Sequence, residues 1–179
     1  MKNIAKRKIL EDLRCDLMSL SYPLSFKDDY SFYSRHGGYN CLAYSLGLKV
    51  KDNYVYLKKN GLFLYTPGTI SYFKNGFVQD ADSLVRAFLD DCNVLNLSYE
   101  EVDISSPLED DSNKVAIYIK PHKFKGLEFG FEDFHFARQN KDGLWSHKTG
   151  YLGDVSYVRD VKNIPEYNFL MAYSLKKKR

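Results

Sequence analysis

Two short strands joined by a tight turn constrain the fold of this chain more than any other feature. Residues 133–139 and 144–148 alternate between apolar and polar side chains, and the four residues NKDG separate them. If the turn is a three-residue loop with Gly143 left-handed, Ala137 pairs with His147 across the hairpin. A two-residue or four-residue loop would shift that register by one residue. The glycine at the end of the turn favours the three-residue loop.

This register places two histidines together. His135 and His147 become diagonal neighbours on one face of the hairpin, roughly 7–8 Å apart between backbones, which two side chains can span. The other loop lengths would put the two on opposite faces. A single half-exposed sheet histidine needs no functional explanation. A pair on one face indicates a site in which His135 acts as a base and His147 orients its imidazole.

Cys41 supplies a matching nucleophile. It follows a glycine pair and Asn40, and it begins a predicted short helix over residues 40–47. The N–H groups at a helix start lower the pKa of a thiol and can receive an oxyanion. A buried apolar thiol is the alternative, and we expect it for Cys15 and Cys92, which lie among leucines in helical patterns.

Three further residues are candidates for the cleft or the oxyanion site: Tyr39, Asn40 and Gln139. Packing explains Tyr39 equally well. The sequence has no glycine-rich phosphate loop and no cluster with metal-ligand spacing. We therefore predict that the chemistry needs neither a metal ion nor an organic cofactor.

The remaining pattern predicts one α+β domain with helices first and sheet second. We place an N-terminal helical extension at residues 1–30, with an amphipathic helix over about 4–20, and the main domain at residues 31–179. A later helix over 84–92 would be capped by Asp82 or Ser83. A soft hairpin signal surrounds residues 60–61, and the acidic stretch 100–111 is expected to be a loop. The predicted strands are 115–120, 131–139, 144–148 and 169–175.

The charge and hydropathy of the sequence limit the partners and the cellular location that we predict for the chain. The net charge of +3 is too small to indicate a nucleic-acid partner, and the basic ends are typical of solvated tails. No stretch approaches the roughly 20 apolar residues of a membrane span. Acidic residues interrupt the first apolar run, so we predict no signal peptide. We expect a chain that is cytoplasmic as synthesised, with non-classical delivery needed for any role outside the cell.

Two strings carry a family resemblance: NCLAYSLGL at residues 40–48 and DFHFARQNKDGLWSHKTG at residues 133–150. They resemble the NlpC/P60 and CHAP branch of papain-like cysteine peptidases and amidases. In NlpC/P60 domains a cysteine opens a helix, a histidine starts a strand, and a third polar residue lies on the next strand. Cys41, His135 and His147 match these positions in order. The strings also resemble a narrower set of bacterial and phage-encoded proteins with NCYAYAL-like and DYHFYRxDxDGxWSHKPG-like motifs.

The resemblance implies a papain-like, NlpC/P60-like α+β fold, in which N-terminal helices pack on an antiparallel sheet. It implies a thiol-dependent amide hydrolase acting on peptidoglycan peptides or on a protein partner. Asn40 replaces the common aspartate and Thr149 the proline of the motifs, which weakens the expectation of a peptidoglycan substrate. A thiol acyltransferase or deamidase, or a non-catalytic binding or assembly module on the same scaffold, are the alternatives.

Overall fold

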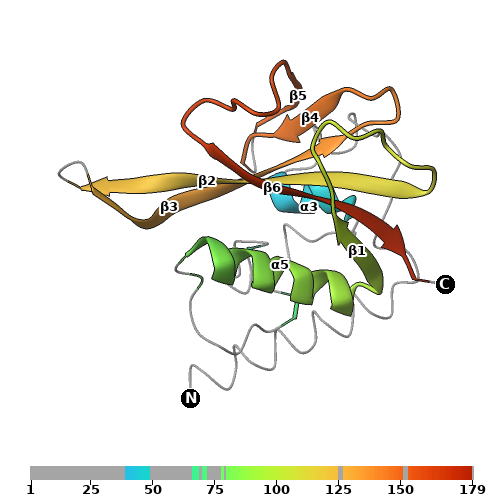
Figure 1. The fold of residues 1–179 in the computed structure, drawn as a ribbon, viewed down its shortest axis with the longest axis horizontal. Coiled ribbons are helices and arrows are strands. Elements are labelled where there is room, and N and C mark those ends of the chain that lie inside the picture. Colours follow the sequence, from blue (N-terminus) through green and yellow to red (C-terminus); the bar gives the residue numbers. More distant parts are fainter. Residues whose placement is uncertain are drawn as a thin grey trace.

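The structure is a computed structural model of the chain (Figure 1). It describes residues 39–48, 66–68, 70–71, 78, 80–124, 127–150 and 153–178, without the side chains of 124 and 127–129. The predicted helix over 4–20, the extension at 1–30, Cys15 and the hairpin signal at 60–61 lie outside the described residues.

A six-stranded antiparallel sheet makes up most of the described part (Figure 1). Its spatial order is β1-β6-β2-β3-β4-β5, so the long β2–β3 hairpin occupies the centre and the C-terminal strand returns beside β2. In chain order the strands are β1 (Leu97–Glu101), β2 (Ser112–Phe124), β3 (Leu127–Gln139), β4 (Trp145–Lys148), β5 (Val155–Val158) and β6 (Asn168–Lys177).

Helix α3 (Cys41–Leu46) forms where the sequence predicts a short helix. The side chain of Asn40 caps it by accepting a hydrogen bond from the N–H of Ala43 at 3.0 Å. Gly47, with φ of 70°, ends it in the left-handed conformation that glycine adopts without strain. Both ends of this helix are therefore fixed by local sequence.

Helix α5 (Ala81–Val94) begins earlier than the sequence predicts. Its N-cap is Asp80, whose carboxylate accepts from the N–H of Ser83 at 2.7 Å, while the N–H of Asp80 donates to the Ser83 hydroxyl at 3.0 Å. This reciprocal pair is a capping box, so the assignment of the cap to Asp82 or Ser83 is wrong. Ser83 is the third helical residue.

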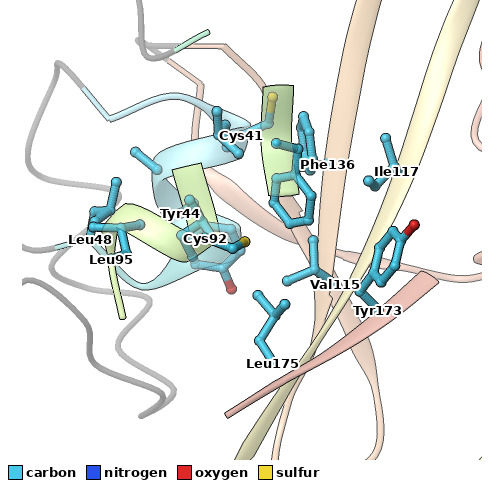
Figure 2. Packing of buried hydrophobic residues seen from close by; sticks show 14 of the residues in the cluster. Cys41, Tyr44, Leu48, Cys92, Leu95, Val115, Ile117, Phe136, Tyr173 and Leu175 are labelled. Carbon is cyan, nitrogen blue, oxygen red and sulfur yellow. The ribbon is translucent and has the colours of Figure 1, made fainter. Parts of the chain in front are cut away.

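Successive side chains of a strand point to opposite faces of the sheet, and in this sheet both faces carry buried residues. One face carries Val115, Ile117, Phe136, Tyr173 and Leu175 and packs against α3 and α5 (Figure 2). The opposite face carries Ala116, Tyr118, Ala137, Trp145 and Ala172, and Ile104 and Ile164 from the loops after β1 and β5 pack on it. We call these the helix face and the loop face.

The predicted fold class is wrong. The described part is β-rich, with one short helix and one longer helix against six antiparallel strands, rather than a papain-like set of helices packed on a sheet. β1 runs into the acidic stretch that we expect to be a loop. Only its first residue is buried, so the strand shows no alternation and its pairing with β6 determines its conformation. β5 was missed for the same reason, since it is held by pairing with β4.

Candidate active site

The β3–β4 hairpin has the predicted register. The N–H of Asn140 donates to the carbonyl of Leu144 at 2.7 Å, and the N–H of Gly143 donates to the carbonyl of Asn140 at 2.9 Å. Gly143 has φ of 83°, and Ala137 pairs with His147. The three-residue loop is therefore confirmed, together with its consequence for the face that His147 occupies.

His135 and His147 are joined by a hydrogen bond. The distance from Nε2 of His135 to Nδ1 of His147 is 2.6 Å, and the ring planes are nearly perpendicular at 89°. Because Nε2 of His135 is engaged in this bond, Nδ1 is the nitrogen that remains for a second proton-transfer partner. In the tautomer in which His135 donates to His147, that Nδ1 carries a lone pair able to accept a proton.

Burial keeps both imidazoles neutral. It lowers the pKa of His135 to about 3, and the adjacent positive charge of a protonated His147 lowers it as well. Burial also lowers the pKa of His147. Near neutral pH neither ring is charged, and a neutral imidazole is the form that can act as a general base.

Aromatic rings and one carboxylate surround His135. Its ring centroid lies 5.2 Å from that of Tyr167 and 6.3 Å from that of Tyr118. The Tyr167 hydroxyl donates to the carboxylate of Asp133 at 2.6 Å, and the Tyr118 hydroxyl donates to the carbonyl of Val161 at 2.7 Å. Both tyrosine rings are thus anchored by their hydroxyl groups, which limits the movement of the imidazole between them.

The Cys41 thiol is buried against β3. Its residue is 5% exposed, and it lies beside Phe136, the residue that follows His135 (Figure 2). Burial raises the pKa of this thiol to about 12, and the Asp133 carboxylate adds to the rise, while the N–H groups of Phe136, Leu42 and Cys41 oppose it. The expectation of a lowered thiol pKa at this helix start is therefore wrong, because desolvation outweighs the amide groups.

Cys41 and His135 reach the same point of β3 from different faces. Phe136 points to the helix face with Cys41, whereas His135 pairs with Tyr118 on the loop face. In the described structure no hydrogen bond joins the thiol to the imidazole. However, Asp133 and Tyr167, which flank His135, both interact electrostatically with the thiol.

The pairing of β3 with β4 ends at this point. Among the described residues it covers only residues 137–139 of β3 and 145–147 of β4. The thiol and the imidazole therefore lie where the strand pairing stops.

The three secondary candidates have different environments. Tyr39 is buried in the same apolar cluster as Cys41, as the packing interpretation predicts. The side chain of Asn40 is engaged in capping α3. Gln139 donates to the carbonyl of Gly143 at 2.9 Å, so it belongs to the hairpin turn. Tyr39 and Asn40 thus adjoin Cys41 in the chain, and Gln139 lies at the turn end of β3, three residues beyond Phe136.

A buried hydrogen-bond chain ties α3 to β4, and sequence reasoning missed it. The hydroxyl of Ser146 donates to Oδ1 of Asn140 at 2.8 Å. Its single proton is thereby used, so the Tyr44 hydroxyl is the donor in the 2.6 Å bond between Tyr44 and Ser146. The guanidinium of Arg138 lies 5.3 Å from the centre of the Tyr44 ring. The chain fixes the helix that begins with Cys41 against the strand that carries His147.

Metal ligation and membrane insertion are two further possibilities for the described residues. No group of three or more His, Cys, Asp and Glu side chains there is arranged to hold a metal ion. Within the same part of the chain, no helix combines the length and the apolar character needed to cross a membrane.

A family model for a domain of unknown function, DUF7689, matches residues 33–173. The chain belongs to the DUF7689 family. The matched part of the DUF7689 domain includes Cys41, His135, His147 and the whole hairpin between the histidines. No curated protein and no solved structure matches the chain. Because the family is one of unknown function, the site geometry has to carry any functional argument for this DUF7689 domain.

Proposed function

We propose that this DUF7689 domain is a thiol-dependent hydrolase of amide bonds, in which Cys41 is the nucleophile, His135 the general base and His147 the residue that orients the base. The observation that carries the proposal is the 2.6 Å hydrogen bond between His135 and His147, one residue along β3 from Phe136, where the Cys41 thiol packs. A base that is held by a second imidazole, one residue along β3 from the position where a helix-start thiol packs, supplies the two kinds of group that nucleophilic acyl transfer requires.

The resting state is a neutral thiol and a neutral imidazole, so proton transfer accompanies attack. Nδ1 of His135 takes the thiol proton as Sγ of Cys41 bonds to the carbonyl carbon. The C–N bond then breaks, and His135 returns the proton to the leaving amine. Nδ1 of His147 accepts the hydrogen bond from Nε2–H of the imidazolium throughout. Water hydrolyses the resulting thioester, which releases the acid and restores the thiol.

The substrate that we propose is a peptide or protein amide, peptidoglycan peptides included. The nucleophile requires a reduced thiol, and both cysteines in the described part of the chain, Cys41 and Cys92, are free. We therefore place the activity in a reducing compartment such as the cytoplasm.

Amine release from two substrate pools tests the proposal. Purified protein is incubated with casein peptides and with muropeptides, and new primary amines are detected by fluorescamine. We expect release by the wild type and by Cys92→Ala, whose thiol lies in α5, and a loss of at least a thousandfold in Cys41→Ala and His135→Ala. Unchanged release by Cys41→Ala, or no release from either pool by the wild type, overturns the proposal.

One observation favours a non-catalytic binding or assembly module instead. Cys41 is almost fully buried and its thiol pKa is raised, as in an ordinary core cysteine. On this alternative Cys41→Ala leaves the protein folded and functional, and iodoacetamide modifies Cys41 no faster than Cys92. Peptide mapping of the alkylated wild type distinguishes the hydrolase from the non-catalytic module without any substrate.

A further inference from the structure

An exposed carboxylate lies beside the candidate site and has no role in the mechanism described so far. Asp133 precedes His135 by two residues in β3, so the two side chains lie on the same face of the sheet. Asp133 also acts on the buried thiol, because its charge contributes to the raised pKa of Cys41. The carboxylate is therefore within electrostatic reach of the proposed nucleophile, and it is open to solvent.

Two neutral donors fix the orientation of this carboxylate. The Tyr167 hydroxyl donates to Oδ2 of Asp133 at 2.6 Å, and the N–H of Phe134 donates to Oδ1 at 2.8 Å. Tyr167 is itself packed against His135, with ring centroids 5.2 Å apart. A carboxylate oxygen can accept more than one hydrogen bond, so both oxygens keep acceptor capacity.

The lysine opposite Asp133 in the sheet pairs with other carboxylates. In the β2–β3 register Lys120 lies opposite Asp133. Its ammonium, however, lies 3.0 Å from the carboxylate of Glu166 and 3.7 Å from that of Glu132. Among the described residues no cationic side chain forms an ion pair with Asp133. A cation that reaches this carboxylate from outside the chain therefore meets an oriented acceptor of opposite charge.

The ring of Tyr167 suits the same kind of ligand. The residue is only half-buried, so part of its ring remains accessible beside the carboxylate of Asp133. A tyrosine ring attracts a cation that lies over its face. A fixed carboxylate next to an aromatic ring is the combination that binds an ammonium or a guanidinium group.

We propose that Asp133 and Tyr167 form the specificity site of the hydrolase, and that its substrates carry a cationic group, an ammonium or a guanidinium, beside the amide bond that Cys41 attacks. The inference rests on the proposed function for the reaction, whereas the preference for a cation can be measured at the thiol alone. The pairing also acts on the nucleophile. The carboxylate opposes formation of the thiolate, and a bound cation offsets that effect.

Modification of Cys41 by thiol reagents of similar size and different charge tests the proposal. The reagents are the 2-aminoethyl, propyl and 2-sulfonatoethyl methanethiosulfonates, which are cationic, neutral and anionic. Peptide mapping gives the rate of each at Cys41 in the full-length protein at neutral pH, and the chain unfolded in urea gives the intrinsic ratio of the rates. We expect the ratio of the cationic to the anionic rate to be at least about tenfold higher in the folded protein. The ratio should fall with added salt, because salt screens an exposed charge.

Three variants identify the source of the preference. Asp133→Asn removes the charge but keeps the size of the side chain, and it should return the ratio to that of the unfolded chain. Tyr167→Phe keeps the ring but loses the hydroxyl that orients the carboxylate, and it should lower the ratio in part. Asp142→Asn is the matched control, because Asp142 is also exposed but lies in the turn of the hairpin, where it accepts from the N–H of Leu144 at 2.9 Å. It should leave the ratio within about twofold of the wild type, because screening weakens distant exposed charges.

The outcomes for the specificity site and for the enzyme proposal are separable. A ratio in the folded wild type no higher than in the unfolded chain overturns the specificity site even if a peptide pool is cleaved, and so does an unchanged ratio in Asp133→Asn. A preference that Asp133→Asn abolishes supports the site even if neither pool is cleaved. If none of the reagents modifies folded Cys41, both proposals are overturned.

Two further measurements complete the test. Circular dichroism establishes that each variant is folded, and the ratio in Tyr167→Phe decides the matter if Asp133→Asn is not. Where a pool is cleaved, mass spectrometry of the new chain ends shows whether the cation is a lysine side chain, an arginine side chain or a free amino terminus. Cleavage without any of these next to the broken bond overturns the specificity site.

Discussion

Replacing Ser146 with alanine tests whether the buried hydrogen-bond chain holds α3 against β4. Ser146 is the middle member, accepting from Tyr44 at 2.6 Å and donating to Asn140 at 2.8 Å. A buried neutral hydrogen bond contributes about 1 kcal/mol net, and a partner that loses its bond costs about 1–3 kcal/mol. Ser146→Ala breaks two bonds and should lower the free energy of unfolding by about 2–4 kcal/mol. Tyr44→Phe breaks one and should lower it by about 1 kcal/mol.

The double variant separates the hydrogen bond from general packing. Once Ser146 is alanine, the Tyr44 hydroxyl has lost this acceptor, so removing the hydroxyl costs little more. We therefore expect the combined loss to be smaller than the sum of the two single losses by about 1 kcal/mol. This coupling free energy is the contribution of the bond between α3 and β4.

Urea unfolding followed by tryptophan fluorescence measures all three variants. The only tryptophan, Trp145, is buried and precedes Ser146 in β4, so it reports directly on this strand. Ser156→Ala and Tyr157→Phe, at exposed positions of β5, are the controls and should change stability by less than about 0.5 kcal/mol. Additive single losses would refute the reasoning, as would a Ser146→Ala loss no larger than that of Tyr44→Phe. In either case this hydrogen-bond chain is not what holds the helix against β4.

Three further predictions concern stability. Gly143 has φ of 83°, so Gly143→Ala should cost about 1–2 kcal/mol in thermal unfolding although the space beside it is open. Burial raises the pKa of Asp91 to about 6, so the folded chain binds this proton more tightly than the unfolded chain. Stability attributable to Asp91 should therefore fall as pH rises from about 4 to about 6, and Asp91→Asn should abolish this fall. Burial lowers the pKa of His135 to about 3. The stability that neutral His135 contributes is therefore fully present above about pH 6.5 and is lost as the pH falls toward 3. His135→Asn should reduce this loss of stability at low pH. Melting temperatures of the wild type and the two variants, measured from pH 3.5 to pH 7.5, give the pH dependence of each contribution. The Asp91 contribution falls as the pH rises, whereas the His135 contribution increases.

The parts of the structure that follow from sequence are those set by local chemistry. The loop over residues 141–143 fixes the register of the β3–β4 hairpin, and that register alone places His147 on the face of His135. Asn40 and Gly47 fix the two ends of α3 in the same way. In each case a turn or cap residue with a particular backbone conformation determines the geometry of its neighbours.

The parts that sequence did not reveal depend on contacts between distant segments. β1 is a strand because β6 pairs with it, and its own five residues carry no alternating pattern. The prediction of a papain-like fold was wrong for the same reason, because two short motifs do not determine how many strands the rest of the chain adds to the sheet. Ser146 likewise depends on a distant segment, because the partner of its hydroxyl on the face opposite the histidines is Tyr44 of α3.

Burial shifts the pKa of Cys41 and the pKa of His135 in the directions that disfavour the charged form of each side chain. A thiol pKa of about 12 and an imidazole pKa of about 3 mean that a proton moved from Cys41 to His135 enters a site too dry for either charge alone. The difference between the two pKa values corresponds to an energy on the order of 10 kcal/mol. On the proposed mechanism, groups that act on the charged state have to offset this energy. On that mechanism the Phe136 N–H beside the thiol and the Nδ1 of His147 beside the imidazole are the groups that stabilise the charged state more than the resting one. Their removal should therefore affect the rate of a thiol reaction far more than the stability of the fold.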